Sequence, residues 1–148
     1  MNSELETAWN LRRSDPKQAL ALGEKAYAVA QEANDLSTQA YSLLVTGYSR
    51  VRLSEPELAL AQLQTALALF ESLDDKDGER KTLNTLGILY GESGELTGAL
   101  KTFLALQTLC AELDDKKGEA DALNNAGIAY LYLGDLARVC LTERMKMV

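Results

Sequence analysis

Hydrophobic residues recur along this chain at the three- to four-residue spacing of an amphipathic helix. No sustained alternation of β-branched and polar residues, which would indicate a strand, competes with that pattern. Turn signals interrupt it at regular places, such as Ser14-Asp15-Pro16 and Ser54-Glu55-Pro56. Asp15 can cap a helix, and a proline suits the first helical position, where its missing N–H costs nothing. The pattern predicts an all-α chain of seven helices and part of an eighth.

The same pattern returns with a fixed offset of 40 residues. Residues 74–90 and 114–130 have nearly the same sequence, and a glycine follows each of them, Gly94 and Gly134. A fixed period of this length is typical of a solenoid of stacked units. No linker divides the chain, so we expect a single domain over 1–148, with units of about 1–35, 36–75, 76–115 and 116–148.

Small residues occupy fixed places in these units. A glycine inside a helix costs about 1 kcal/mol relative to alanine, so three at equal spacing need a structural reason. We expect the two helices of each hairpin to approach closely at these points. The positions are Gly47, Gly87 and Gly127 in the first helices and Ala19, Ala59 and Ala99 in the second helices.

One run of positions carries a family resemblance. The pattern Leu83-x-x-Leu86-Gly87-x-x-Tyr90, then Gly94, then Ala99-x-x-x-Phe103-x-x-Leu106 resembles the tetratricopeptide repeat (TPR), and Leu123-x-x-Ala126-Gly127-x-x-Tyr130 is similar. The 40-residue spacing resembles the long-helix variant found in bacterial signalling and regulatory proteins. The resemblance implies a right-handed superhelical solenoid of antiparallel helix hairpins, with about 3.5 such units.

Both ends of the chain depart from that pattern. Thr7 stands where the later units have Gly, and Asn10 stands where the third and fourth units have Tyr and the second has Arg50, which predicts a degenerate or capping first helix. In the last unit we expect the first helix to end at Gly134 and an incomplete second helix to begin at Leu136. Its pattern is altered, because Val139, Glu143 and Lys146 replace the Ala99, Phe103 and Leu106 of the unit before. One hypothesis is that the chain is a truncated or altered piece of a longer protein.

Composition narrows the classes of function. The net charge of −7 repels phosphate backbones, so we expect no nucleic-acid partner. No apolar run is long enough for a membrane, and no signal peptide is visible. Cys110 and Cys140 make no disulfide framework, so we expect a reduced cytoplasmic protein.

The residues needed for common catalytic chemistry are missing. The chain has no histidine, no phosphate-binding glycine loop and no Ser–His or Cys–His pair, so we expect neither an enzyme nor a cofactor. The pairs Asp74-Asp75 and Asp114-Asp115 are the nearest approach to a metal site. A calcium loop needs more oxygen ligands from one segment, which favours solvated turn residues.

The resemblance implies a concave groove lined by the first helices of the hairpins. Asn84 and Asn124 occupy the same place in successive units, and by the resemblance an asparagine there holds a ligand's peptide backbone. An amide side chain supplies the donor and the acceptor that this requires. The alternative is that both are surface positions tolerating a polar residue. The face opposite the packing positions gives the candidate groove residues: Tyr41, Leu44, Tyr48, Lys81, Asn84, Ile88, Asp121, Asn124, Asn125 and Ile128.

Two functions remain open. The first is a non-enzymatic scaffold that binds a peptide or protein segment in the groove, for which the regulatory part of a larger signalling protein is one setting. Four basic residues offer an anionic partner an anchor, or they belong to a solvated helix face: Arg50, Arg52, Arg80 and Lys81. The second is a self-assembly module, in which an incomplete last hairpin leaves an apolar face for homo-oligomer formation through the C-terminal helices.

Overall fold

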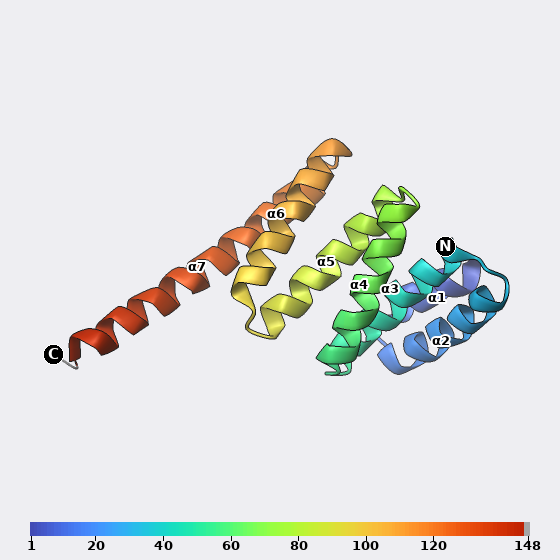
Figure 1. Ribbon diagram of the computed structural model, residues 1–148, viewed down its shortest axis with the longest axis horizontal. Helices are drawn as coiled ribbons and strands as arrows, with labels where there is room; N and C mark the ends of the chain where they lie inside the picture. Colours follow the sequence, from blue (N-terminus) through green and yellow to red (C-terminus); the bar gives the residue numbers. More distant parts are fainter. Residues whose placement is uncertain (147–148) are drawn as a thin grey trace.

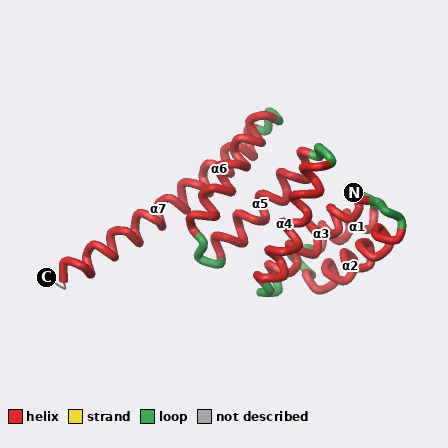
Figure 2. Tube along the Cα trace, in the orientation of Figure 1, coloured by secondary structure: helices red, strands yellow, loops and turns green. Residues whose placement is uncertain are grey.

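The computed structural model describes residues 1–146 and contains, within them, seven helices and no strand. Each helix packs against the next and runs antiparallel to it, so the chain forms a row of helix hairpins (Figures 1 and 2). The predicted all-α helical-hairpin solenoid is confirmed. The helices are α1 (Ser3–Leu11), α2 (Pro16–Glu32), α3 (Leu36–Arg52), α4 (Pro56–Ser72), α5 (Lys76–Glu92), α6 (Leu96–Glu112) and α7 (Lys116–Lys146).

The turns after α2 to α6 share one design. Each of these helices has 17 residues, and a residue with positive φ stands two positions after its last residue, for example Gly94 at 77° after Glu92. The N–H of the next residue then donates to a carbonyl in the last turn of the helix, as Glu95 does to Tyr90 at 2.8 Å. This arrangement satisfies carbonyls that the helix end would otherwise leave unpaired. An aspartate often follows and caps the next helix, as Asp75 accepts from the N–H of Gly78.

The predicted close approach of paired helices is confirmed at two of the three glycines. A Cβ atom on Gly47 would lie 2.7 Å from the Leu63 side chain, and one on Gly87 would lie 2.5 Å from the Phe103 ring. At Gly127 the prediction is wrong, because a Cβ atom there would meet nothing within 4 Å. The second helix that would fill this place is not folded against α7.

The predicted end of a helix at Gly134 is also wrong. Helix α7 has 31 residues and continues through Leu133-Gly134-Asp135-Leu136 (Figure 1). Its later part is exposed, including Val139 and Glu143 at the positions of the buried Ala99 and Phe103. A turn at Gly134 would bring little apolar surface against α7, whereas continuation adds one backbone hydrogen bond per residue. No helix within residues 1–146 is long and apolar enough to cross a membrane.

Candidate functional site

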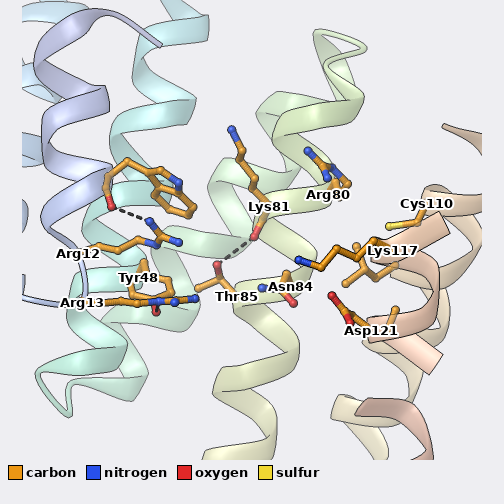
Figure 3. Close-up of a pocket in the computed structure, with 14 residues that line it drawn as sticks. Arg12, Arg13, Tyr48, Arg80, Lys81, Asn84, Thr85, Cys110, Lys117 and Asp121 are labelled. Atoms are coloured by element: carbon orange, nitrogen blue, oxygen red, sulfur yellow. Dashed lines mark hydrogen bonds between the residues drawn. The ribbon is translucent and has the colours of Figure 1, made fainter. Parts of the chain in front are cut away.

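A cleft of about 420 Å³ lies where α1, α3, α5 and α7 follow one another (Figure 3). We call it the basic cleft, because its lining contains five cationic side chains and one carboxylate. The turn after α1 supplies two of the cations, α5 supplies two, and the first turn of α7 supplies one. The lining residues are Trp9, Arg12, Arg13, Tyr48, Arg80, Lys81, Asn84, Thr85, Leu106, Cys110, Lys117, Gly118, Asp121 and Ala122.

Aromatic rings and arginines form one end of the basic cleft. The rings of Trp9 and Tyr48 meet edge to face with their centroids 5.7 Å apart. The guanidinium carbon of Arg12 lies 3.9 Å from the centroid of Trp9 and 5.1 Å from that of Tyr48. Its Nη1 donates to the Trp9 carbonyl at 2.7 Å, and Nε of Arg13 donates to the Tyr48 hydroxyl at 3.3 Å. These contacts hold two arginines side by side.

The electrostatic state of Arg12 is unusual. Burial lowers the pKa of its guanidinium below the ordinary value, and the nearby charge of Arg13 acts in the same direction although Tyr48 opposes it. The Nε atom of Arg12 is buried and has no hydrogen-bond partner among the described residues. A buried N–H without an acceptor is energetically costly. The cleft therefore contains a partly desolvated cation that its own chain does not fully satisfy.

The cations of α5 are better compensated. Arg80 pairs with Asp77 and, at 2.8 Å, with Asp115, while Nζ of Lys81 lies 3.1 Å from Asp77. The pKa of Asp115 is held below its usual range by the backbone N–H of Gly118 and by Arg80. Burial raises the pKa of Asp77, but its contacts with Arg80 and Lys81 outweigh that effect and lower it.

Three cations of the cleft have no such compensation. Among residues 1–146, neither Arg12, Arg13 nor Lys117 makes an ion pair with a carboxylate. Lys117 projects from α7 across the cleft toward α5 (Figure 3). The cleft is therefore positive although the whole chain is acidic.

The structure brings seven of the ten candidate groove residues to two hollows. Four of them line the basic cleft: Tyr48, Lys81, Asn84 and Asp121. Three others, Ile88, Asn125 and Ile128, line a second hollow of about 270 Å³ between α5, α6 and α7. We call it the apolar pocket, because Phe103, Leu96 and Tyr132 complete much of its wall.

Of the other three candidates, Tyr41 lines a further hollow of about 390 Å³ together with Trp9 and Lys81, whereas Leu44 and Asn124 lie elsewhere. Leu44 is 0% exposed, and Tyr41 packs its ring on Phe70 with the centroids 4.8 Å apart. The Tyr41 hydroxyl donates to Asp75 at 2.6 Å, and burial together with this contact raises the pKa of Tyr41 above its usual value. Both residues belong mainly to the core because α4 and α5 pack on α3. Asn124 is exposed on α7 and lines neither hollow.

Three of the five cations that give the cleft its charge, Arg12, Arg13 and Lys117, were missed from the sequence, whereas Arg80 and Lys81 were predicted as anchors for an anionic partner. Trp9, Arg12 and Arg13 belong to the first helix and its turn, where the repeat pattern is degenerate and gives no position to compare. The available signal was the single tryptophan of the chain placed beside two consecutive arginines. Lys117 was overlooked because the repeat has Asp77 at the same place in the preceding unit.

The remaining polar features have structural roles. Asp75 and Asp115 cap α5 and α7 by accepting from the N–H groups of Gly78 and Gly118, each at 2.9 Å. Cys110 is buried, and burial raises the pKa of its thiol, whereas Cys140 is exposed on α7. Within residues 1–146 no group of three or more Cys, Asp and Glu side chains is placed to hold a metal ion.

In comparisons with known proteins, no family model and no curated sequence matches this chain. The sequence period and the geometry agree with each other without such a match. Helices α3 and α5 begin and end exactly one 40-residue period apart, as do α2 and α4. The chain has the architecture of a helical-repeat protein.

Proposed function

We propose that this chain is a non-enzymatic interaction module of the tetratricopeptide-repeat type, and that it binds an acidic peptide or protein segment in the basic cleft. The observation that carries the proposal is the local excess of cations in a protein of net charge −7. Three of these cations, Arg12, Arg13 and Lys117, make no ion pair within residues 1–146. A carboxylate from a partner supplies the missing acceptor.

The chemistry of the Arg12 end favours a carboxylate over a neutral group. A guanidinium presents planar, parallel N–H donors that match the two oxygens of a carboxylate. The contacts with Trp9 and Tyr48 restrict the Arg12 side chain before a ligand arrives, which lowers the entropy lost on binding. Burial strengthens the interaction, because the effective dielectric constant is lower than in water.

Neighbouring residues suit the rest of a peptide. Asn84 is exposed within the basic cleft, and its amide can pair with both backbone groups of an extended segment. The apolar pocket follows along α5, where Ile88 is one helical turn beyond Asn84. A segment that spans both hollows has acidic residues near Arg12 and Lys117 and an apolar residue near Ile128.

Selection from a displayed peptide library, followed by titration calorimetry with the recovered peptides, tests this proposal. We expect peptides enriched in Asp and Glu, with affinities that fall as the salt concentration rises. Lys117→Glu should weaken binding about tenfold or more, because it removes one attraction and adds a repulsion. Lys101→Glu is the matched control, since Lys101 is an exposed lysine on α6 outside the cleft.

The two asparagines refine the test. We expect Asn84→Ala to weaken binding, whereas Asn124→Ala has a smaller effect because Asn124 lies outside both hollows. Recovered peptides without acidic enrichment, or equal affinity for the Lys117→Glu and Lys101→Glu variants, would overturn the acidic-segment proposal.

Self-assembly is a second candidate function, and the exposure of α7 supports it. Tyr130 and Leu131 are each 68% exposed, Tyr132 is 57% exposed and Leu136 is 55% exposed. Exposed large apolar side chains gathered on one helix commonly mark an interaction site. Tyr132 belongs to the wall of the apolar pocket, whereas Tyr130 lines neither hollow, so the two functions are compatible where self-assembly uses the side of α7 that carries Tyr130. The regulatory part of a larger signalling protein would accommodate both.

A further inference from the structure

One stripe of α7 has the spacing of a coiled-coil seam. Its six residues are separated alternately by four and three positions, which places them along one side of the helix. All six are exposed, and the three large ones are 48%, 68% and 58% exposed in chain order. We call this stripe the α7 seam, and its members are Leu123, Gly127, Tyr130, Gly134, Ala137 and Leu141.

The α7 seam is separate from the basic cleft and the apolar pocket. Asp121 and Ile128, which line those hollows, lie on another side of α7 by helical periodicity. Helix α6 covers a third side through the buried residues Ala122, Ala126 and Ala129. In the earlier hairpins the following helix packs on the side that carries the repeat glycine, where Leu63 contacts Gly47 and Phe103 contacts Gly87. The α7 seam contains the matching Gly127 and lies on that side of α7.

The chain's own C-terminal segment is a poor occupant of this seam. Leu63 and Phe103 each stand 16 residues after the glycine that they cover. The residue at that distance from Gly127 is Glu143, so a fold-back at Gly134 would press a carboxylate onto an apolar groove. This agrees with the continuous helix through Gly134.

We propose that a second copy of this chain covers the α7 seam, with the two α7 helices antiparallel and related by a two-fold axis at the level of Tyr132. The proposal extends the self-assembly function by adding an orientation and a register. In this register, residues equidistant from Tyr132 meet across the axis. Leu123 meets Leu141 of the second copy, Gly127 meets Ala137, and Tyr130 meets Gly134.

The self-complementary sizes favour a second copy over an unrelated partner. A two-fold interface requires that one surface complement itself, residue by residue. Here the large Tyr130 faces a glycine, two leucines face each other, and small residues in the other layer allow close approach of the helices. In an antiparallel coiled coil, each layer brings one of the two alternating seam positions of one helix against the other position of its partner. The pairs given by this register meet that requirement. The seam from Leu123 to Leu141 spans about 27 Å of helix, enough for several layers.

The side chains of the α7 seam are open to a partner. Helix α6 is the helix against which α7 packs, and the end of α7 extends beyond it (Figure 1). Two copies would each place the free end of α7 over the seam of the other, in an exchange that resembles domain swapping. The interface would bury Leu123, Tyr130 and Leu141 from both copies.

Sedimentation equilibrium of the intact chain over the micromolar range tests the partner. We expect a dimer, and we expect Leu141→Asp to weaken association about 100-fold, because each substitution acts twice in a symmetric interface. Val139→Asp is the matched control. Val139 and Leu141 are each 58% exposed on the same part of α7, but Val139 lies outside the seam. Neither change removes a buried contact of the monomer.

Cysteine cross-linking tests the register. A Leu123→Cys/Leu141→Cys variant, made with Cys140→Ser, should form a covalent dimer under mild oxidation. A Leu123→Cys/Val139→Cys variant in the same background should form much less. A strictly monomeric chain overturns both self-assembly and the register. A dimer that tolerates Leu141→Asp, or that gives only linkage within one chain, overturns the register alone.

Discussion

The hairpin of α5 and α6 and the long helix α7 start from nearly the same sequence and reach different structures. In the hairpin, Gly94 adopts φ 77° and ends the first helix, and Phe103 then returns to cover Gly87. In α7, Gly134 stays helical and Gly127 remains uncovered. The sequences differ on both sides of the glycine: Gly91-Glu92-Ser93 precede Gly94, Leu131-Tyr132-Leu133 precede Gly134, and the segments that follow also differ.

The comparison shows that a glycine after a helix permits a turn but does not impose one. The turn at Gly94 is stabilised by the helix that follows it, because Phe103, Leu106 and Cys110 of that helix become buried. The matching segment of α7 has Glu143 and Lys146 in the first two of those places, and it offers no such burial. Local propensity acts in the same direction, because Gly91 and Ser93 are weaker helix formers than the Leu131 and Leu133 of α7. Tertiary packing and local propensity therefore both favour a turn at Gly94 and a continuous helix at Gly134.

The largest expected effect is the loss of stability when the buried ring after the turn at Gly94 is removed. Phe103→Ala should lower the free energy of unfolding by about 4 kcal/mol, because it removes a ring that is 6% exposed and leaves a cavity against Gly87. Glu143→Ala, at the same repeat position, should change stability by less than about 0.5 kcal/mol. Urea denaturation followed by circular dichroism measures both. Similar losses for the two variants would contradict the comparison.

Substitutions after Gly134 should convert the single helix α7 into a hairpin like that of α5 and α6. Val139→Ala/Glu143→Phe/Lys146→Leu restores the pattern of α6 after Gly134, and we expect the segment to fold back onto α7. Burial of one new aromatic ring should stabilise the chain by about 2 kcal/mol. Spin labels at Leu123 and Leu141, read by pulsed electron resonance in dilute samples, should show a shorter distance within the chain. An unchanged distance would mean that more than this pattern is needed.

Most of the fold was predictable because its rules are local and repeated. Each helix boundary from α2 to α6 follows from a turn residue, an acidic residue just before the helix and a 40-residue offset, all visible in the sequence. The exception at Gly134 was not predictable from the turn alone. The altered residues Val139, Glu143 and Lys146 are visible in the sequence. Their consequence depends on whether burial of this segment would offset the conformational entropy lost in ordering a turn.

The candidate groove residues were less predictable. Their spacing indicates the side of the helix on which a side chain lies, but it does not indicate whether another helix packs against that side. Asn84 and Ile88 do line hollows, since α5 has neighbours on both sides. Tyr41 points in a similar direction on α3 but meets Phe70 and Asp75. Arg12 gains its role from contacts with Trp9 and Tyr48, which join helices distant in sequence.

A smaller effect compares the glycines themselves. Gly87→Ala should destabilise the chain by about 1 kcal/mol, since the crowding against Phe103 exceeds the gain in helix propensity. Gly127→Ala should instead stabilise the dilute monomer by about 0.5–1 kcal/mol, because a Cβ atom there meets nothing within 4 Å. Thermal denaturation of the two variants side by side gives the sign of each change. The same sign in both would contradict the difference in packing.

The smallest expected effect is on the unfolding free energy at acidic pH. It compares Asp115, just before α7, with Asp135, inside α7. The pKa of Asp115 is depressed in the folded chain by the N–H of Gly118 and by Arg80, so the resulting stability is present above the pKa of the unfolded chain. It is lost as the pH falls through the lower, folded value. Asp115→Asn should therefore flatten the decline of unfolding free energy with falling pH.

Asp135→Asn is the control for that measurement, because Asp135 lies within the continuous helix at the place where a turn was expected. Its ion pair is with the exposed Arg138. Denaturant titrations at a series of acidic pH values should give Asp135→Asn the same profile as the unsubstituted chain. Arg80→Gln should reproduce part of the Asp115→Asn effect, since it removes one of the two groups that lower the pKa of Asp115. A profile for Asp115→Asn that matches the unsubstituted chain would show that its contacts with Gly118 and Arg80 do not favour the ionised form in solution.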